Sequence, residues 1–265
     1  SSDLVSELLP QVNALQRTTV SASEIVLATK CGGSDGYSGI TANPALGAAA
    51  DLLIAHGGTS ILSETTELYG AEQLFTKRAQ SVAVAKKLLD KMVWWRNYTA
   101  HYGEDIDNNP SLGNKAGGLT TIVEKSLGAA VKGGTTALQD VIEYAEQTSK
   151  RGLVIMDAPG FDPVCVTGMV AGGANVVVFT TGRGSCFGCK PAPSIKVATN
   201  TPLFERMSDD MDLNMGTILT GESIAEAGAR MFDAILETAS GKKTKSELLG
   251  YGDDEFCPWS IGPTL

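Results

Sequence analysis

Short runs of apolar, β-branched residues alternate along this chain with longer segments of helical periodicity. The clearest predicted strands are residues 24–29, 59–63, 153–157, 175–181 and 194–199. Several of these runs are continuously apolar, as expected of strands buried on both faces. The predicted helices lie at 44–56, 77–101, 119–132, 163–172 and 223–240. This alternation predicts an α/β fold, a mostly parallel sheet with helices on both faces.

The predicted organisation is a single α/β domain spanning residues 1–265. A helical lead-in at 1–23 precedes it, and residues 242–265 form a C-terminal tail. The chain begins without an initiator methionine, so we expect it to be a fragment of a longer protein. Residues 103–118 form the longest polar, glycine-rich connection, and connections of that length are usually functional or disordered.

Composition and charge exclude several classes of partner. The hydrophobic content of 43%, with 19% charged residues, is ordinary for a soluble globular protein. The net charge of −9 and the absence of a basic run argue against nucleic acid. No apolar stretch reaches the ~18 residues of a membrane span, and no signal peptide pattern is present. Five cysteines at irregular spacing favour reduced thiols, so we expect a cytoplasmic protein.

Small and ionisable residues follow four of the predicted strands. These segments are Lys30–Ser38 (KCGGSDGYS), Glu64–Glu67 (ETTE), Ala158–Asp162 (APGFD) and Gly182–Ser185 (GRGS). In open α/β sheets, ligands bind at the carboxyl ends of the strands. The four segments therefore predict one shared site at that edge of the sheet.

The segment after the predicted strand 175–181 suggests two further kinds of site, and neither is supported. A dinucleotide-binding turn must open a helix. Pro191, Pro193 and another strand follow the glycines instead, so nucleotide binding is rejected. Cys186 and Cys189 form an isolated C-x-x-C pair, which favours an ordinary glycine-rich turn over a zinc or redox site.

Two loops carry candidate anion-binding groups. Arg183, flanked by glycines at a strand end, can bind a carboxylate bidentately beside bare backbone N–H groups. The alternative is an ordinary arginine of a surface turn. The loop that begins at Cys31 offers backbone donors, two hydroxyls and a carboxylate, and Cys31 or Asp35 is suited to a metal ion. The alternative there is a plain strand-to-helix turn with a buried cysteine.

Three residues are candidates for acid–base chemistry. Glu64 and Glu67 follow a strand and suit either a general base or a metal ligand. An acid-rich first helical turn is the structural alternative. Lys115, next to Asn114 in the long polar loop, suits a carboxylate partner or a desolvated base, and a solvated loop lysine is its alternative.

The two histidines, His56 and His101, both fall at predicted helix ends, and no G-x-S-x-G motif is present. A Ser-His-Asp hydrolase therefore has little support, and a histidine-rich metal site is excluded. Asn43 is the expected N-cap of the helix that starts at Pro44.

Several of these motifs in one order resemble the C-terminal domain of the altronate/galactarate dehydratase family, which includes the large subunit of sulfolactate sulfo-lyase. They are KCGGSDGYSGITANP, SETTE, GNKAGGLTTIVEKSLGA, MDAPGFDPVCVTG, VVVFTTGRGS and MSDDMDLNMGTI. The resemblance covers nearly the whole chain, and it implies that the chain is the C-terminal fragment of a longer enzyme. It implies a Rossmann-like variant, dependence on Fe²⁺ or another divalent cation, and elimination from a hydroxy-acid.

The expected function is therefore dehydration of a sugar acid, such as galactarate or altronate, to a 2-keto-3-deoxy acid. Release of sulfite from sulfolactate is the alternative, and a non-catalytic binding domain is the alternative of another class. The resemblance also implies a homo-oligomer, and a small N-terminal β domain or separate subunit as partner. The catalytic candidates are Glu64, Glu67 and Lys115, and the metal candidates are Cys31 and Asp35. The substrate-binding candidates are Gly32, Gly33, Ser34, Asp35, Ser38, Asn43, Asn114 and Arg183.

Overall fold

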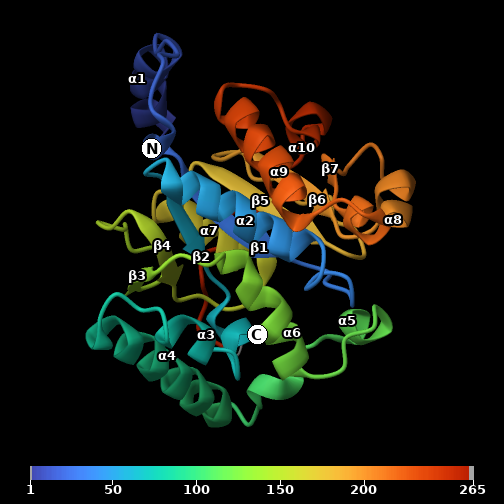
Figure 1. The fold of residues 1–265 in the computed structure, drawn as a ribbon. Coiled ribbons are helices and arrows are strands. Elements are labelled where there is room, and N and C mark those ends of the chain that lie inside the picture. Colours follow the sequence, from blue (N-terminus) through green and yellow to red (C-terminus); the bar gives the residue numbers. More distant parts are fainter. Residues whose placement is uncertain (1, 263–265) are drawn as a thin grey trace.

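The computed structural model describes residues 2–262, and it contains one seven-stranded sheet in which all neighbouring strands are parallel (Figure 1). The strand order is β3-β4-β2-β1-β5-β6-β7. The strands are β1 Val26–Cys31, β2 Thr59–Leu62, β3 Leu138–Ile142, β4 Gly152–Met156, β5 Val176–Thr181, β6 Ser194–Ala198 and β7 Leu213–Asn214. The predicted α/β fold is confirmed.

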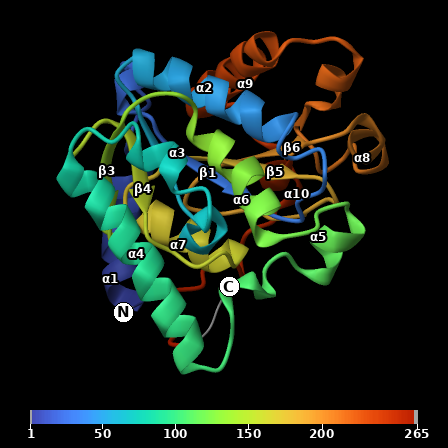
Figure 2. The same cartoon turned by 60° about the horizontal axis from the view of Figure 1, so that its bottom comes forward.

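Helices cover both faces of this sheet (Figure 1, Figure 2). They are α1 Ser2–Asn13, α2 Ala42–Ala55, α3 Gln73–Thr76, α4 Val82–His101, α5 Leu112–Ala116, α6 Ile122–Ala130, α7 Asp162–Ala171, α8 Thr201–Arg206, α9 Ile224–Ala239 and α10 Lys245–Leu249. Helices α2 and α9 pack together on one face, and α7 packs against β1 on the other. Helix α1 projects from the body and buries none of its residues. Over residues 2–262, none of the helices has the length and apolar character needed to cross a membrane.

The central strands are apolar at successive positions because each of their faces meets a different core. Leu27 of β1 and Val176 of β5 face the cluster under α2 and α9. Ala28 and Val177, one position further along, face the cluster under α7. Since successive side chains of a strand point to opposite faces, both must be apolar when helices cover both faces. All six residues of β5 are buried accordingly.

Two strands were not predicted, and one was displaced. β3 carries Gln139 and Asp140, and β7 has only two residues, so neither shows a continuous apolar run. β1 begins and ends two residues later than the predicted 24–29. Lys30 and Cys31 pair with Phe179 and Thr180 of β5, which extends the strand past its apolar stretch.

The prediction that Asn43 is the N-cap of its helix is wrong. Helix α2 begins at Ala42, Thr41 occupies the cap position, and Asn43 lies within the first turn. Its side chain donates to the carbonyl of Gly128 at 2.8 Å and accepts from the Thr180 hydroxyl at 2.6 Å. Asn43 therefore links α2 to α6 and to the end of β5.

The sheet reverses its direction of growth between β1 and β5. From β1 the chain continues to β2 on one side, whereas β5, β6 and β7 follow on the other side. In open parallel sheets, ligands bind in the crevice at such a switch point, outside the carboxyl ends of the strands. The carboxyl ends of β1 and β5 are Cys31 and Thr181, so the loops that follow them are placed to form a site.

Candidate active site

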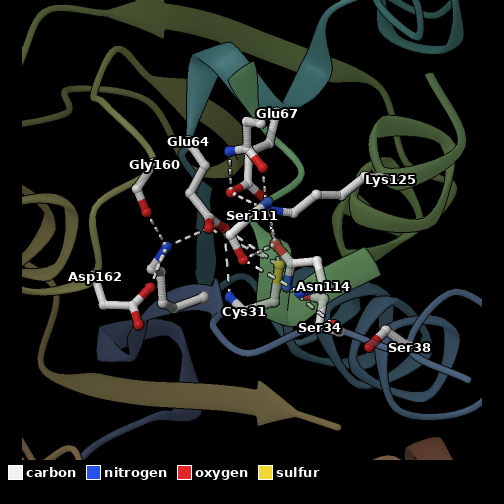
Figure 3. A network of polar contacts seen from close by, with 12 residues as sticks. Cys31, Ser34, Ser38, Glu64, Glu67, Ser111, Asn114, Lys125, Gly160 and Asp162 are labelled. Carbon is white, nitrogen blue, oxygen red and sulfur yellow. Dashed lines mark hydrogen bonds and ion pairs between the residues drawn. The ribbon is translucent and has the colours of Figure 1, made fainter. Parts of the chain in front are cut away.

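The residue at the centre of this crevice is Cys31, the last residue of β1. Its Sγ lies 3.8 Å from both carboxylate oxygens of Glu64 and 3.7 Å from Oε2 of Glu67 (Figure 3). Glu64 and Glu67 come from the segment after β2, and all three residues are buried. One ligand atom from each lies within 4.8 Å of the others, the arrangement of a candidate metal group.

Glu64 reaches this position through a strained backbone. Its φ of +66° is left-handed, which is unusual for a residue with a side chain. Such a conformation costs about 1–3 kcal/mol and persists only when surrounding contacts impose it. Here Lys30 and Lys132 each bond one oxygen of the Glu64 carboxylate, and the Cys31 backbone N–H lies 3.4 Å from Oε2. These contacts hold the carboxylate beside the thiol.

Lys30, in β1, contacts the segments that follow two neighbouring parts of the sheet, β2 and β4. Its buried ammonium bonds Glu64, the carbonyl of Gly160 at 2.8 Å and the Asp162 carboxylate at 2.9 Å. Burial alone would lower its pKa, but Asp162 and Glu64 raise it well above the usual value. Lys30 therefore stays charged, and it holds the segments after β2 and β4 against the end of β1.

A second group of contacts surrounds Glu67. The ammonium of Lys125, from α6, donates to Glu67 Oε1 at 2.8 Å and to the Asn109 side-chain oxygen at 2.7 Å. Asn109 also donates its amide to Glu67 Oε1 at 3.2 Å. Asn114 Oδ1 lies 3.3 Å from the Lys125 ammonium, and its amide donates to the Ser34 carbonyl at 3.0 Å. This group ties α5 and α6 to the loop after β1.

Cys31 and Glu67, one from each group of contacts, differ in protonation state. Burial and the nearby Glu64 carboxylate raise the pKa of the Cys31 thiol to about 11, despite Lys132. Burial would also raise the pKa of Glu67, but Lys125, Lys30 and Lys132 together lower it to about 2. At neutral pH, Cys31 is therefore a thiol and Glu67 a carboxylate.

Asp35 makes its described contacts outside the Cys31 group. One carboxylate oxygen accepts from the Ser38 hydroxyl and the Tyr37 backbone, at 3.0 and 3.1 Å. The other accepts from Thr199 and Asn200 beyond β6, at 3.0 and 3.1 Å. These contacts tie the loop after β1 to the end of β6. They give Asp35 a clear bracing role, and its metal role stays a prediction.

Two adjoining cavities open onto the site. The first, of about 250 Å³, is lined by the predicted Ser34, Asp35, Ser38 and Asn43, and we call it the Ser34 cavity. The second, of about 310 Å³, is lined by the predicted Gly32, Gly33, Glu67, Asn114 and Arg183, and we call it the Arg183 cavity. Cys31 and Lys125 line both cavities. These two residues therefore form the wall that the cavities share.

Gly32 is required by close packing at this wall. A Cβ on Gly32 would lie 2.4 Å from an oxygen of Asp162 and 2.5 Å from the Phe179 ring. Real Cβ atoms do not approach other atoms so closely, so a larger residue would have to displace the Asp162 side chain and the Phe179 ring of β5.

Two predicted catalytic residues lie apart from the cavities. Glu64 is buried behind Cys31 and lines neither of them, and Lys115 is exposed on α5 and also lines neither. Among the three catalytic candidates, Glu67 is the one that faces a cavity. The roles assigned to Glu64 and Lys115 stay predictions.

The lysines of the site were missed by sequence reasoning. Lys30 is the lone charged residue at the end of an otherwise apolar strand, which is a detectable signal. Lys125 and Lys132 are seven residues apart in IVEKSLGAAVKG, a spacing that returns to the same helix face. Asn109 and Asp162 give no such local pattern, because folding alone brings them to the crevice.

Comparison with known proteins agrees with the motifs. Residues 22–264 match the model of the family described as D-galactarate/altronate dehydratase, C-terminal. The chain is 48% identical over 236 residues to galactarate dehydratase (L-threo-forming) of Escherichia coli, covering 89% of this chain and 45% of that protein. It is 39% identical over 245 residues to altronate dehydratase of Bacillus subtilis, covering 92% and 49%.

A third relative has a different named activity. It is (2R)-sulfolactate sulfo-lyase subunit beta of Chromohalobacter salexigens, 35% identical over 252 residues, covering 92% of this chain and 64% of that protein. The chain thus spans about half the length of the two dehydratases and less than two thirds of the sulfo-lyase subunit.

Proposed function

This chain belongs to the D-galactarate/altronate dehydratase, C-terminal, family, and from that premise we propose that it dehydrates a sugar acid such as galactarate or altronate. The observation that carries the proposal is the buried group of Cys31, Glu64 and Glu67 at the switch point of the sheet, beside two cavities. Buried ionisable groups with strongly displaced pKa values are typical of catalytic sites.

The proposed reaction removes water across two adjacent carbons. A proton leaves the carbon next to the carboxylate, and hydroxide leaves the following carbon, so that one molecule of water is lost. The resulting enol becomes a 2-keto-3-deoxy acid. The site must therefore supply a base for the carbon-bound proton and groups that stabilise negative charge on the substrate oxygens.

The residues present fit a ferrous ion or another divalent cation. Thiolate and carboxylate are ligand types that bind such ions, and Cys31 and Glu64 of this group would hold it, which leaves Glu67 beside them to act as a base. When bound, the ion would supply a Lewis acid that polarises a substrate oxygen. Within residues 2–262, no lysine donates to Glu67 Oε2, whereas Lys132 bonds both Cys31 and Glu64. Lys132 is therefore the side chain that must give up contacts when these residues act as ligands.

Glu67 is the proposed base, and its strength depends on Lys125. A carboxylate with a pKa of about 2 binds protons weakly at neutral pH. Lys125 is the strongest of the charges that lower this pKa, and it also lines both cavities. A substrate oxygen that accepts from Lys125 therefore competes with Glu67 for the ammonium. The pKa of Glu67 then rises toward the range suited to proton abstraction.

Sulfite release is the second candidate, because one relative is named as a sulfolactate sulfo-lyase subunit. The same base and charge-stabilising groups would serve if sulfite left in place of hydroxide. That relative's name also includes the word subunit, which supports a separate partner chain or a further domain for the whole enzyme. We further propose that the whole enzyme is a homo-oligomer.

A substrate panel tests the proposal. The chain would be incubated anaerobically with Fe²⁺ and galactarate, altronate or sulfolactate, and 2-keto-3-deoxy acid and sulfite would be measured. Keto acid from a sugar acid is the expected result. Sulfite from sulfolactate alone would favour the second candidate. No product from any of the three would contradict catalysis by this chain and favour a domain that only binds.

A further inference from the structure

The charges inside the site are already balanced before any substrate enters. Three buried or half-buried carboxylates, those of Glu64, Glu67 and Asp162, are bonded by three lysines. Each of these lysines, Lys30, Lys125 and Lys132, has at least one carboxylate partner. A substrate carboxylate that entered this group would have to displace one of them.

Arg183 lines the Arg183 cavity and takes no part in these lysine–carboxylate pairs. Within residues 2–262, its guanidinium has no hydrogen-bond or ion-pair partner, and the residue is exposed. It lies along Gly113, where an added Cβ would be 3.5 Å from Nε and 3.9 Å from Cζ. These are ordinary van der Waals distances, so the guanidinium passes alongside the backbone of α5 at the edge of the cavity.

A backbone donor lies beside it. The N–H of Gly33 bonds no acceptor in the part of the chain that the structure describes, and Gly33 lines the same cavity. The Gly33 carbonyl accepts from the backbone N–H groups of Gly182 and Arg183, both at 3.1 Å. These two bonds fix the loop after β1 against the loop after β5. The free N–H and the free guanidinium are thus held on one wall.

We propose that Arg183 and the Gly33 N–H form the receptor for the substrate carboxylate next to the reacting carbon, which rests on the proposed function for the identity of the substrate. A guanidinium and a bare backbone N–H are donors that suit a planar carboxylate. Glu67 and Cys31 line the same cavity, so the carbon beside that carboxylate lies toward the base and the metal candidates. The receptor therefore orients the substrate, with its carboxylate toward Arg183 and the adjacent carbon toward Glu67.

Binding of two matched ligands tests this assignment without turnover. Galactonate and galactitol share a carbon chain, but only galactonate carries a carboxylate. Titration calorimetry would measure both against wild type, Arg183→Gln, Arg183→Lys and the control Arg206→Gln. Arg206→Gln removes an equal charge close to Arg183, because Arg206 donates to the Arg183 carbonyl at 3.2 Å. Arg206 lines neither cavity, so it serves as the control.

We expect wild type to bind galactonate at least about tenfold more tightly than galactitol, the scale of one hydrogen bond to a charged group. Arg183→Gln should bring the ratio close to one, Arg183→Lys should keep part of it, and Arg206→Gln should leave it unchanged. Equal affinities in wild type, no binding of either ligand, or a ratio that survives Arg183→Gln would overturn the receptor.

The receptor and the proposed function fail in different ways. A chain that prefers galactonate through Arg183 but dehydrates no sugar acid contradicts the proposed function alone. A chain that dehydrates a sugar acid with an unchanged KM in Arg183→Gln contradicts the receptor alone. Circular dichroism of each variant confirms that the exposed substitution leaves the fold intact.

Discussion

The ammonium nitrogen of Lys132 lies 2.8 Å from the sulfur of Cys31, and both side chains are buried. Burial would lower the pKa of Lys132, but Cys31 and Glu64 raise it, so the lysine stays charged. The same burial raises the pKa of the thiol to about 11. In the metal-free protein this pair is therefore an ammonium beside a neutral thiol, and Cys31 is not poised as a nucleophile.

Cys31 should react slowly with alkylating agents in the folded protein. The thiolate is the reactive form, and burial both restricts access and suppresses ionisation. Cys186 is exposed and serves as the internal control. Timed iodoacetamide labelling at neutral pH, read by peptide mass spectrometry, should modify Cys186 first and Cys31 only after denaturation. Equal labelling rates for the two would contradict the buried, neutral thiol.

Lys132→Met should destabilise the chain strongly. The substitution leaves the buried Glu64 carboxylate short of a partner, and breaking a buried pair on one side typically costs about 3–5 kcal/mol. Lys86→Met is the matched control, because Lys86 and Asp90 form an exposed pair worth at most about 1 kcal/mol. Urea denaturation measures both. Equal losses of the free energy of unfolding would show that Lys132 contributes no more than a surface lysine.

Acid should destabilise the metal-free protein through Glu67. Its pKa falls from 4.5 to about 2 on folding, so the unfolded chain binds this proton first as pH falls. The stabilisation is therefore complete above about pH 4.5 and is lost as pH falls toward 2. Glu67→Gln removes this titration, so the Tm of the variant should fall less steeply than that of wild type between pH 6 and 3. An identical slope in both proteins is the contrary result.

Iron binding should depend on Cys31 and not on Asp35. Anaerobically purified wild type is expected to retain Fe²⁺, and Cys31→Ala is expected to lose it. Asp35→Asn should keep the metal, because both Asp35 oxygens already accept hydrogen bonds from the loops. It should lower Tm instead. Metal analysis beside thermal unfolding separates the two effects, and loss of iron in Asp35→Asn would support Asp35 as a ligand instead.

The parallel sheet was predictable because its central strands are apolar on both faces. The edge strands were not predictable in this way. In β3, for example, Gln139 and Asp140 are only partly buried, so they need not be apolar. Pattern also located the loops of the site, through the glycines and ionisable residues at the strand ends. It missed Lys30 and Lys132, because only folding brings the acid that pairs with their ammonium groups beside them. Such pairings depend on distances across the sheet.

The rate of keto-acid formation by Glu67→Gln tests whether Glu67 is the base of a sugar-acid dehydratase. Wild type, Glu67→Gln and Glu237→Gln would be compared anaerobically with Fe²⁺ and the best sugar acid of the panel, with bound iron measured in each. Glu237 pairs with Lys242 at the surface and is the matched control. We predict a loss of about 10²–10⁴-fold in kcat for Glu67→Gln, the usual contribution of a general base, and no change for Glu237→Gln. An unchanged kcat in Glu67→Gln would contradict it.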